Sequence, residues 1–403
     1  MIVNLTYAPL YLPSHQLPYP ILPMNRRAFI HHSAVGVAVA ALPQLRSADL
    51  APVQMTSDPK LTGYRAALLE KFATHVHGRE PLGLTVTSSW NSPASGTHRA
   101  TLKVTSSLAG SKSRELSVAL HLPPGAAPSA PVPCVLLLDH RGWANMEPAA
   151  MPDQSYWPLA LIHAAGWAAA AIDTTEIVPD LAADAARDPG ILSLDTGLRD
   201  ASRPGAVSAW AWGASRAADA LTRHSMIDGT RLAVIGHSRS GKAALLAAAR
   251  DERFAAVGIN QSGCGGVAHT ATKVGERIAE LFKNFPHWFA PAWNDYAGRE
   301  ASLPVDQHLL LACVAPRLAF VNSATQDQWA DPAAEFRSCQ FASAIWELHG
   351  RRGLAGGNLS SLPAPDTGLL EGSLAYHLRT GEHDLGVADW KPFLSFLKAR
   401  LAV

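Results

Sequence analysis

The sequence predicts an α/β fold, a three-layer sandwich in which helices cover both faces of a mostly parallel sheet. Continuous apolar runs of strand length recur along the chain, which is typical of parallel strands buried on both faces. These runs alternate with segments of helical periodicity, as in repeated βαβ units. Beyond residue 60 the 403-residue chain shows no repeat, low-complexity tract or linker. We therefore expect one domain there, large enough to bury an extensive core.

The expected elements follow from side-chain periodicity in chain order. Residues 99–104 and 115–122 alternate between polar and apolar side chains, which predicts half-buried strands. Fully buried strands are predicted at five continuous apolar runs, at 133–138, 167–172, 232–235, 255–259 and 318–321. Apolar residues recur at helical spacing over 207–221 and 243–249, and a last helix is expected at about 388–401. In such a sheet, functional residues are expected just past the carboxyl ends of the strands.

Charge, hydropathy and cysteine spacing exclude several classes of protein. The 34 Lys and Arg against 33 Asp and Glu give a net charge of +1, whereas a dedicated nucleic-acid binder carries a basic surplus. No apolar run reaches 18 residues, so no membrane span is predicted. The four cysteines lack a CxxC spacing and no His/Asp cluster has zinc spacing, so we predict no metal and no other cofactor. His287 and His308 are expected to make structural hydrogen bonds. We expect a monomer that binds neither nucleic acid nor membranes.

The N-terminal segment has the pattern of an export signal. Asn25-Arg26-Arg27 is a twin-arginine pattern, and a short apolar run follows at 34–42. Met24 directly precedes the pattern and is a candidate start of translation. We therefore assign residues 1–48 to an N-terminal extension with a twin-arginine-type signal peptide, and residues 49–403 to a single domain. The signal predicts an exported protein, either periplasmic or secreted.

The segment around Ser238 combines a strand, a tight turn and a helix, and it permits two interpretations. Gly236 to Lys242 fits the phosphate loop G-x-x-x-x-G-K, but Ala243 stands where that motif needs a hydroxyl for Mg²⁺. The same residues fit a nucleophile elbow, G-x-S-x-G, with Ser240 in place of the last glycine. An elbow exposes the Ser238 hydroxyl above the sheet. The missing Mg²⁺ ligand favours the elbow.

A serine nucleophile needs a histidine base and an acid that orients the histidine. In the α/β-hydrolase arrangement the chain order is serine, acid, histidine. Asp327 follows the predicted strand 318–321 and lies 89 residues after Ser238. Asp331 is the rival acid, but Pro332 follows it, which is typical of a helix N-cap. We favour Asp327 as the acid and keep Asp331 as the alternative.

The candidate base is His383. It lies 56 residues after Asp327, in a loop that follows a further predicted strand, from about Ala375, and a glycine turn at Gly381. His377 lies inside the pattern of that strand and is expected to be packed. The chain holds 17 histidines, so chain order rather than residue type distinguishes His383. The sequence thus predicts a Ser238–His383–Asp327 triad.

Four blocks of the chain, taken in order, resemble the glucuronoyl esterases, carbohydrate esterase family 15 of the α/β-hydrolase superfamily. The likeness is to the bacterial members of the family. The blocks are residues 236–242, residues 260–266, a long segment within 285–308, and a last one within 315–332. The resemblance runs from about Arg203 to the C-terminus, roughly half the chain, and implies an α/β-hydrolase fold.

The resemblance also implies a role for each matching residue. Ser238 is implied as the nucleophile and His383 as the base, while the backbone N–H and guanidinium of Arg239 are implied to face the oxyanion. Three further residues fall on positions that hold the glucuronoyl sugar in the family: Lys242, Glu276 and Trp329. Lys and Glu side chains can bond hydroxyls, and a Trp ring offers a flat apolar face to a pyranose.

The chain departs from the family pattern at one position. Many family members carry a glutamate acid shortly after the strand that follows the serine motif, where this chain has Gln261. A neutral amide cannot stabilise an imidazolium electrostatically. Some bacterial relatives place the acid after the following strand instead, and Asp327 matches that position.

The implied activity is hydrolysis of 4-O-methyl-glucuronoyl esters that join glucuronoxylan to lignin alcohols, by an acyl-enzyme mechanism. Glucuronoxylan or a lignin–carbohydrate ester is then the expected partner. Three alternatives stay open from the sequence: an acetylxylan or general carboxylesterase, a non-catalytic glucuronoxylan-binding relative, and a phosphate-loop nucleotide binder.

Overall fold

The computed structural model describes residues 60–92, 97–107, 112–142, 156–197 and 199–401. These residues fall within one compact unit of the chain, Met55–Val403. The predicted N-terminal extension and signal peptide, residues 1–48, lie outside the described residues. Among the helices that are described, none is both long and apolar enough to cross a membrane.

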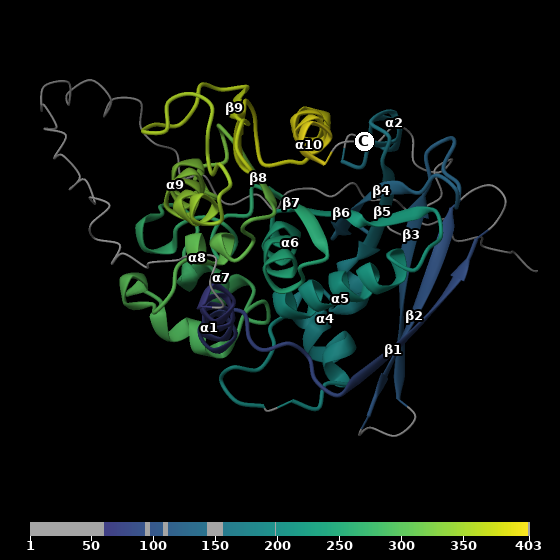
Figure 1. Ribbon diagram of the computed structural model, residues 1–403. Coiled ribbons are helices and arrows are strands. Elements are labelled where there is room, and N and C mark those ends of the chain that lie inside the picture. The colour runs from purple at the N-terminus through teal and green to yellow at the C-terminus, as the bar shows by residue number, and fades with distance from the viewer. Residues whose placement is uncertain (1–59, 93–96, 108–111, 143–155, 198, 402–403) are drawn as a thin grey trace, which may run out of the picture. The chain divides into compact units, whose positions relative to one another are not determined.

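Ten strands of the described residues form one sheet, in the order β1-β2-β3-β5-β4-β6-β7-β8-β10-β9 (Figure 1). From β5 to β10 in this order, neighbouring strands run parallel. The pairs β1–β2, β2–β3 and β3–β5 are antiparallel, and so is β9 against β10. The mostly parallel sheet predicted from the sequence is thus confirmed. The strands are β1 (Leu84–Asn91), β2 (His98–Ser106), β3 (Ser113–His121), β4 (Val132–Asp139), β5 (Ala168–Asp173), β6 (Ile227–His237), β7 (Phe254–Asn260), β8 (Leu318–Ala324), β9 (Thr367–Leu369) and β10 (Leu374–Arg379).

Helices precede, connect and follow these strands. The α-helices are α1 (Lys60–His75), α2 (Leu159–Ala164), α3 (Thr174–Ile177), α4 (Ala182–Arg187), α5 (Ala206–Leu221), α6 (Arg239–Arg250), α7 (Ile278–Asn284), α8 (Gln307–Ala312), α9 (Pro332–Leu348) and α10 (Val387–Arg400). Short 3₁₀ helices are η2 (Gly190–Ser193), η3 (Thr270–Thr272), η4 (Pro291–Tyr296) and η5 (Glu300–Ser302).

The helices lie on both faces of the sheet and bury two separate cores (Figure 1). Side chains alternate between the faces because successive strand residues point in opposite directions. On β4, Leu136 and Leu138 join the core that contains α1, α5, α6, α8 and α9. Val135 and Leu137 join the core under α2 and α10. The four cysteines are free thiols, all in the larger core.

The predicted elements are present, and the differences have physical reasons. Strand β6 begins at Ile227, five residues before the predicted run at 232–235. The prediction missed these first residues because most of them are polar, and a bulge interrupts the pairing of this part of the strand with β4. Strand β1 escaped prediction because Thr and Ser residues obscure its alternation at the edge of the sheet. The last helix spans Val387–Arg400, one residue from the predicted 388–401.

Candidate active site

The loop between β6 and α6 holds the predicted nucleophile on a strained turn. Ser238 has φ +56° and ψ −124°, a conformation that costs a residue with a Cβ atom about 1–3 kcal/mol. Its backbone N–H donates to the Asn260 carbonyl oxygen on β7 at 2.9 Å, which holds the turn against the sheet. A Cβ atom on Gly236 would lie 2.1 Å from the Ser240 carbonyl oxygen, so only glycine fits there. The turn therefore has the sharpness of a nucleophile elbow, with Ser238 at the start of α6.

Ser240 replaces the last glycine of the elbow pattern, and its hydrogen bonds explain why it is tolerated. Its side chain is buried, and its Oγ donates to the His237 carbonyl oxygen at 2.9 Å. The same Oγ accepts the His237 backbone N–H at 3.2 Å and lies 3.1 Å from His140 Nδ1. The hydroxyl thus closes the turn from inside.

The acid and base candidates come from neighbouring parallel strands. Asp327 follows β8 and His383 follows β10, and the two strands pair in parallel, so their carboxyl ends meet at one edge of the sheet. His383 Nδ1 donates to Asp327 Oδ2 at 2.6 Å. Asp327 is 5% exposed and also accepts the Ala330 N–H at 3.1 Å, while His383 is 42% exposed. Because Nδ1 is engaged by the carboxylate, Nε2 of His383 is the nitrogen left to accept a proton.

The rival acid, Asp331, has a different set of partners. It is the N-cap of α9, where its Oδ1 accepts the Ala334 N–H at 3.1 Å. Its Oδ2 accepts the Val274 N–H at 2.7 Å. Both carboxylate oxygens of Asp331 therefore bind backbone groups, and the structure places Asp327, not Asp331, against the histidine.

Gln261 clamps the loop that carries the histidine. Its Nε2 donates to the Asp384 carbonyl oxygen at 2.9 Å, and its Oε1 accepts the Asp384 N–H at 3.0 Å. The residue is buried, has φ +47°, and its own N–H donates to the Asn322 carbonyl oxygen at 2.8 Å. The amide supplies both a donor and an acceptor to Asp384, which an ionised carboxylate cannot do. Gln261 thus fixes the backbone next to His383, a function that the sequence did not reveal.

A second histidine, His237, packs against the ring of His383 and stays uncharged. The rings of His237 and His383 have centroids 4.4 Å apart, and His237 Nδ1 is hydrogen-bonded to Asn260 Oδ1 at 2.5 Å. Burial, with the neighbouring His383 and His140, holds the pKa of His237 well below its ordinary value of 6.5. His237 therefore stays neutral beneath His383.

The three residues implied to hold a sugar form one connected chain. Trp329 is 53% exposed, and its indole N–H donates to Glu276 Oε1 at 3.3 Å. The other carboxylate oxygen of Glu276 lies 3.5 Å from Lys242 Nζ. The three side chains thus place a flat ring, a carboxylate and an ammonium group next to one another in space.

Lys242 lacks the free ammonium group that a phosphate loop requires. The side chain is buried, and its Nζ donates to the carbonyl oxygens of Ser262 at 2.7 Å and Cys264 at 2.6 Å. A phosphate-loop lysine instead reaches the phosphates of a nucleotide. Together with Ala243 at the position of the Mg²⁺ ligand, these contacts disfavour the phosphate-loop interpretation.

Lys273 holds the segment that presents Glu276, and no local pattern in the sequence indicated this. Its Nζ donates to the carbonyl oxygens of Val274 at 2.5 Å, Glu276 at 2.6 Å and Trp329 at 3.2 Å. Burial lowers the pKa of Lys273 below its ordinary value. All three N–H groups of the ammonium are thus used to join two segments that are far apart in the chain.

The guanidinium of Arg239 is fixed by an acidic and two aromatic side chains. It forms an ion pair with Asp180 and lies 5.0 Å from the ring centroid of Trp288 and 5.6 Å from that of Phe285. The two rings stack 3.9 Å apart, and Trp288 Nε1 donates to Asp180 Oδ1 at 3.2 Å. Asp180 was not predicted, because it lies 59 residues from Arg239.

A buried glutamate, Glu335, connects the segments on either side of the candidate acid Asp327. Glu335 on α9 accepts the Gly263 N–H at 3.0 Å and the Ser323 hydroxyl at 2.6 Å. Burial raises the pKa of Glu335 from its ordinary 4.5 to about 7, and nearby Asp327 adds to the rise. The side chain therefore links α9 both to β8 and to the loop after β7.

These groups converge on one cavity at the carboxyl edge of the sheet. Every predicted site residue contributes to its lining, together with the clamp residue Gln261. The lining residues are Ser238, Arg239, Lys242, Gln261, Ser262, Gly263, Glu276, Phe285, Trp288, Asp327, Trp329, Ala330 and His383. The cavity therefore brings together the predicted triad, Arg239 and the three residues implied to hold a sugar, and it leaves out the rival acid Asp331.

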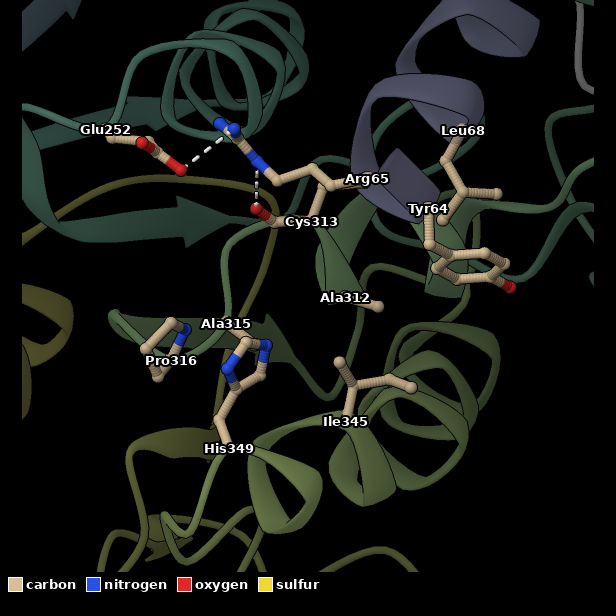
Figure 2. Close-up of a pocket in the computed structure, with 10 residues that line it drawn as sticks. All are labelled: Tyr64, Arg65, Leu68, Glu252, Ala312, Cys313, Ala315, Pro316, Ile345 and His349. Atoms are coloured by element: carbon tan, nitrogen blue, oxygen red, sulfur yellow. Dashed lines mark hydrogen bonds and ion pairs between the residues drawn. The ribbon is translucent and has the colours of Figure 1, made fainter. Parts of the chain in front are cut away.

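A second cavity, between α1, α8 and α9, lacks such chemistry (Figure 2). Its one thiol, Cys313, has a pKa raised to about 12 by burial, so it does not form the reactive thiolate. The cavity's arginine, Arg65, forms an ion pair with the Glu252 carboxylate at 2.9 Å and donates to the Cys313 carbonyl oxygen at 3.1 Å. The reactive groups thus gather in the cavity of Ser238.

Comparison with known proteins gives one matching family model and several similar curated proteins. A family model described as "Glucuronyl esterase, fungi" matches residues 105–350, a range that contains Ser238 and Asp327 and ends before His383. The carbohydrate esterase MZ0003 from an unknown prokaryotic organism is 42% identical over 192 residues, which are 48% of this chain and 44% of that protein. A 4-O-methyl-glucuronoyl methylesterase of Podospora anserina is 35% identical over 156 residues, 36% of this chain and 32% of that protein. The matches therefore span less than half the length of these curated relatives.

A solved structure extends the likeness over most of the chain. The glucuronoyl esterase from Solibacter usitatus is similar with a TM-score of 0.71 and 33% sequence identity. The likeness covers 83% of this chain and 91% of that one.

Proposed function

Because the chain belongs to the glucuronyl esterase family, we propose that it is a serine esterase that hydrolyses esters of 4-O-methyl-glucuronate. The observation that carries the proposal is the 2.6 Å hydrogen bond between Asp327 and His383 in the cavity that Ser238 lines. With Ser238 on a positive-φ turn at the start of α6, the three side chains supply the nucleophile, base and orienting acid of acyl transfer.

The first half-reaction transfers the glucuronoyl group to the serine. Ser238 Oγ attacks the C6 ester carbonyl while His383 Nε2 takes the serine proton. The Asp327 carboxylate holds the other ring nitrogen and stabilises the imidazolium that forms. His383 then gives the proton to the leaving alcohol, and the C–O ester bond breaks. Water attacks the glucuronoyl-enzyme by the same steps and releases the uronic acid.

Arg239 supplies the oxyanion donors. Its backbone N–H stands at the first residue of α6, where helix N–H groups lack intrahelical partners and favour negative charge. Its guanidinium lines the same cavity and is held there by Asp180. A donor of this kind lowers the barrier by about 3 kcal/mol in acyl transfer.

The sugar ring is held by Lys242, Glu276 and Trp329. The exposed indole of Trp329 stacks on the pyranose, and the Glu276 carboxylate accepts its hydroxyls. Lys242 has two of its N–H groups on backbone carbonyls, so it acts mainly by holding Glu276 in place. This wall gives selectivity for the uronate, while the alcohol leaves on the open side.

The physiological substrate is proposed to be the ester between glucuronoxylan and a lignin alcohol. A polymer of this size is met outside the cytoplasm, so the substrate fits the twin-arginine-type signal proposed for residues 1–48. Export through that signal is part of the same proposal.

The test is hydrolysis of benzyl glucuronate by the full chain, beside benzyl galacturonate and an acetylated xylan. We expect turnover of the glucuronate ester that disappears in Ser238→Ala, with the variant folded as judged by circular dichroism. The galacturonate differs at one hydroxyl, so it reports on the sugar wall alone.

Each other outcome identifies an alternative. Equal rates on all three substrates point to a general or acetylxylan esterase. Binding of glucuronoxylan by the folded wild type without turnover points to a non-catalytic relative. Turnover that survives in Ser238→Ala excludes the serine mechanism.

A further inference from the structure

Two histidines and one aspartate form a cluster apart from the active-site cavity. His269 lies in the loop after β7, whereas Asp306 is the N-cap of α8 and His308 is in its first turn. One ligand atom from each lies within 4.8 Å of the others. His269 Nε2 is 3.5 Å from Asp306 Oδ2, and the two imidazole rings stack with centroids 5.3 Å apart. The described residues thus contain a convergent N₂O donor set.

Neighbouring groups already orient two of the three donors. His269 Nδ1 is hydrogen-bonded to Thr272 Oγ1 at 2.9 Å, which leaves Nε2 facing Asp306. Three backbone N–H groups donate to the Asp306 carboxylate, those of Thr270 at 2.7 Å, Ala271 at 2.9 Å and Gln307 at 2.6 Å. Hydrogen bonds of this kind, made by atoms that do not themselves ligate, fix the direction of metal ligands.

The third donor is the least constrained. Within the described part of the chain, Nδ1 of His308 is buried and has no hydrogen-bond partner. Phe341 on α9 packs edge-on against both imidazoles, with ring centroids 5.2 Å from His269 and 5.5 Å from His308. A small rotation of the His308 ring therefore breaks no hydrogen bond at Nδ1, and an apolar side chain partly screens the cluster from water.

We propose that His269, Asp306 and His308 bind a divalent transition-metal ion, for which Zn²⁺ is the best fit. Two imidazole nitrogens and one carboxylate oxygen are ligands that Zn²⁺ takes, with water at the fourth position. Two ligands bonded at about 2.1 Å in a tetrahedron lie about 3.4 Å apart, close to the 3.5 Å between His269 Nε2 and Asp306 Oδ2. Mg²⁺ and Ca²⁺ prefer all-oxygen sites and fit this set poorly.

This inference departs from the sequence-based expectation that the chain binds no metal and that His308 makes a structural hydrogen bond. Zinc motifs are recognised by ligand pairs at short spacing, and His269 is 37 residues from Asp306. Only the fold brings the loop after β7 to the start of α8.

The site has a clear place in the architecture. It joins the η3 turn, which ends at Thr272, to α8. Lys273 follows directly and holds the carbonyl oxygens of Glu276 and Trp329. A bound ion therefore stiffens the segment from which Glu276 enters the active-site cavity.

The test is metal uptake by the full chain after chelator treatment, measured by calorimetry with Zn²⁺ and by visible spectroscopy with Co²⁺. We expect one ion per chain, tetrahedral Co²⁺ bands and a raised melting temperature with Zn²⁺. His308→Ala is expected to weaken binding at least tenfold and to remove the bands. This variant is chosen because Nδ1 of His308 has no hydrogen bond to lose.

Two control variants keep the result specific. His349→Ala removes a histidine of the second cavity (Figure 2), and His383→Ala removes the histidine of the proposed active site. Both are expected to bind one Zn²⁺ with unchanged affinity. If His308→Ala does not fold, His308→Gln, which keeps a polar side chain of similar size, replaces it.

The proposal is overturned if the wild type takes up no stoichiometric ion, or if the His308 variant binds as tightly as the wild type. It is also overturned if His349→Ala or His383→Ala weakens binding as much as the His308 variant does. Uptake is measured without substrate, so this outcome is independent of whether the chain is an esterase.

Discussion

The two sides of the active-site cavity are built in different ways. The serine turn consists of residues 236–241, and the contacts that shape it are made within the turn, to the adjacent strand β7 and to His140 after β4. The acid wall consists of Gln261, Glu276, Asp327, Trp329 and His383. Hydrogen bonds join these residues to one another or to Asp384, next to His383, across as many as 123 residues of chain. The difference teaches that a turn can be specified by its own sterics, whereas the wall depends on buried polar groups that hold distant segments together.

The largest expected effect falls on the acid wall at Asp327. In Asp327→Asn the partner of His383 can no longer stabilise an imidazolium, so kcat for benzyl glucuronate should fall about 10⁴-fold. Asp331→Asn is the matched control four residues away, where the side chain caps α9. It should lower the melting temperature, because an amide has one acceptor oxygen where the carboxylate accepts both the Val274 and the Ala334 N–H, while leaving kcat within about threefold. The reverse ranking of the two variants would assign the acid to Asp331.

The next effect concerns stability and comes from Glu335. Its pKa in the fold is about 7 against an ordinary 4.5, so the folded state holds a proton that the unfolded chain releases in this window. Its contribution to stability is therefore complete below pH 4.5 and is lost as the pH rises through 7, by up to about 3 kcal/mol.

Glu335→Gln should remove this dependence of stability on pH, because an amide does not titrate. The amide can still accept from the Gly263 N–H and can donate to Ser323, so the local hydrogen bonds are kept. Urea unfolding of both proteins at pH 5 and pH 8 measures the effect, and the difference between them cancels all other titrating groups. Equal slopes in the two proteins would mean that the Glu335 carboxyl does not titrate in this window.

A smaller effect is expected at the clamp on the histidine loop. Gln261→Glu replaces the donor to the Asp384 carbonyl oxygen with a buried negative charge, so kcat should fall about 10- to 100-fold. Gln326→Glu makes the same chemical change at an exposed position of the neighbouring loop and should alter kcat less than threefold. Comparison of the two separates the lost hydrogen bond from the added charge. A rise in activity in Gln261→Glu would show instead that position 261 can serve as the acid.

The smallest effect is expected on the serine turn. Ser240→Gly restores the usual elbow pattern but removes the bonds of the Ser240 hydroxyl to His237 and to His140. Each such bond contributes about 1 kcal/mol, and the backbone of the turn keeps its own contacts, so kcat should change less than threefold. Unfolding and steady-state kinetics on one preparation measure both quantities. A large loss of activity would mean that the turn is not shaped mainly by its backbone, which would weaken the contrast with the acid wall.

Sequence patterns predicted the parts of the site that depend on short segments. The spacing of Gly236 and Ser238 indicated the elbow, because a Cβ atom on residue 236 would meet the backbone of residue 240. Pro332 favoured Asp327 over Asp331 as the acid, because it marked the helix start that Asp331 caps. The parallel strands were predictable because continuous apolar runs are typical of strands buried on both faces.

Other features of the site left no trace in local patterns. Gln261 was noticed only as a missing acid, and its two hydrogen bonds to Asp384 depend on the placement of a loop 123 residues away. Lys273 and Glu335 bind backbone groups of segments that are distant in the chain. Side chains of this kind look like ordinary charged residues until their burial is known.

The amino-acid order alone specifies the buried strands of the sheet, the helices α5, α6 and α10 and the strained serine turn, because periodicity and backbone sterics act over a few neighbouring residues. Which acid meets His383, what replaces the family's glutamate, and how His269 comes to face Asp306 depend on packing. Buried polar groups must find partners wherever the fold places them, and those partners are set by the arrangement of the sheet rather than by spacing along the chain.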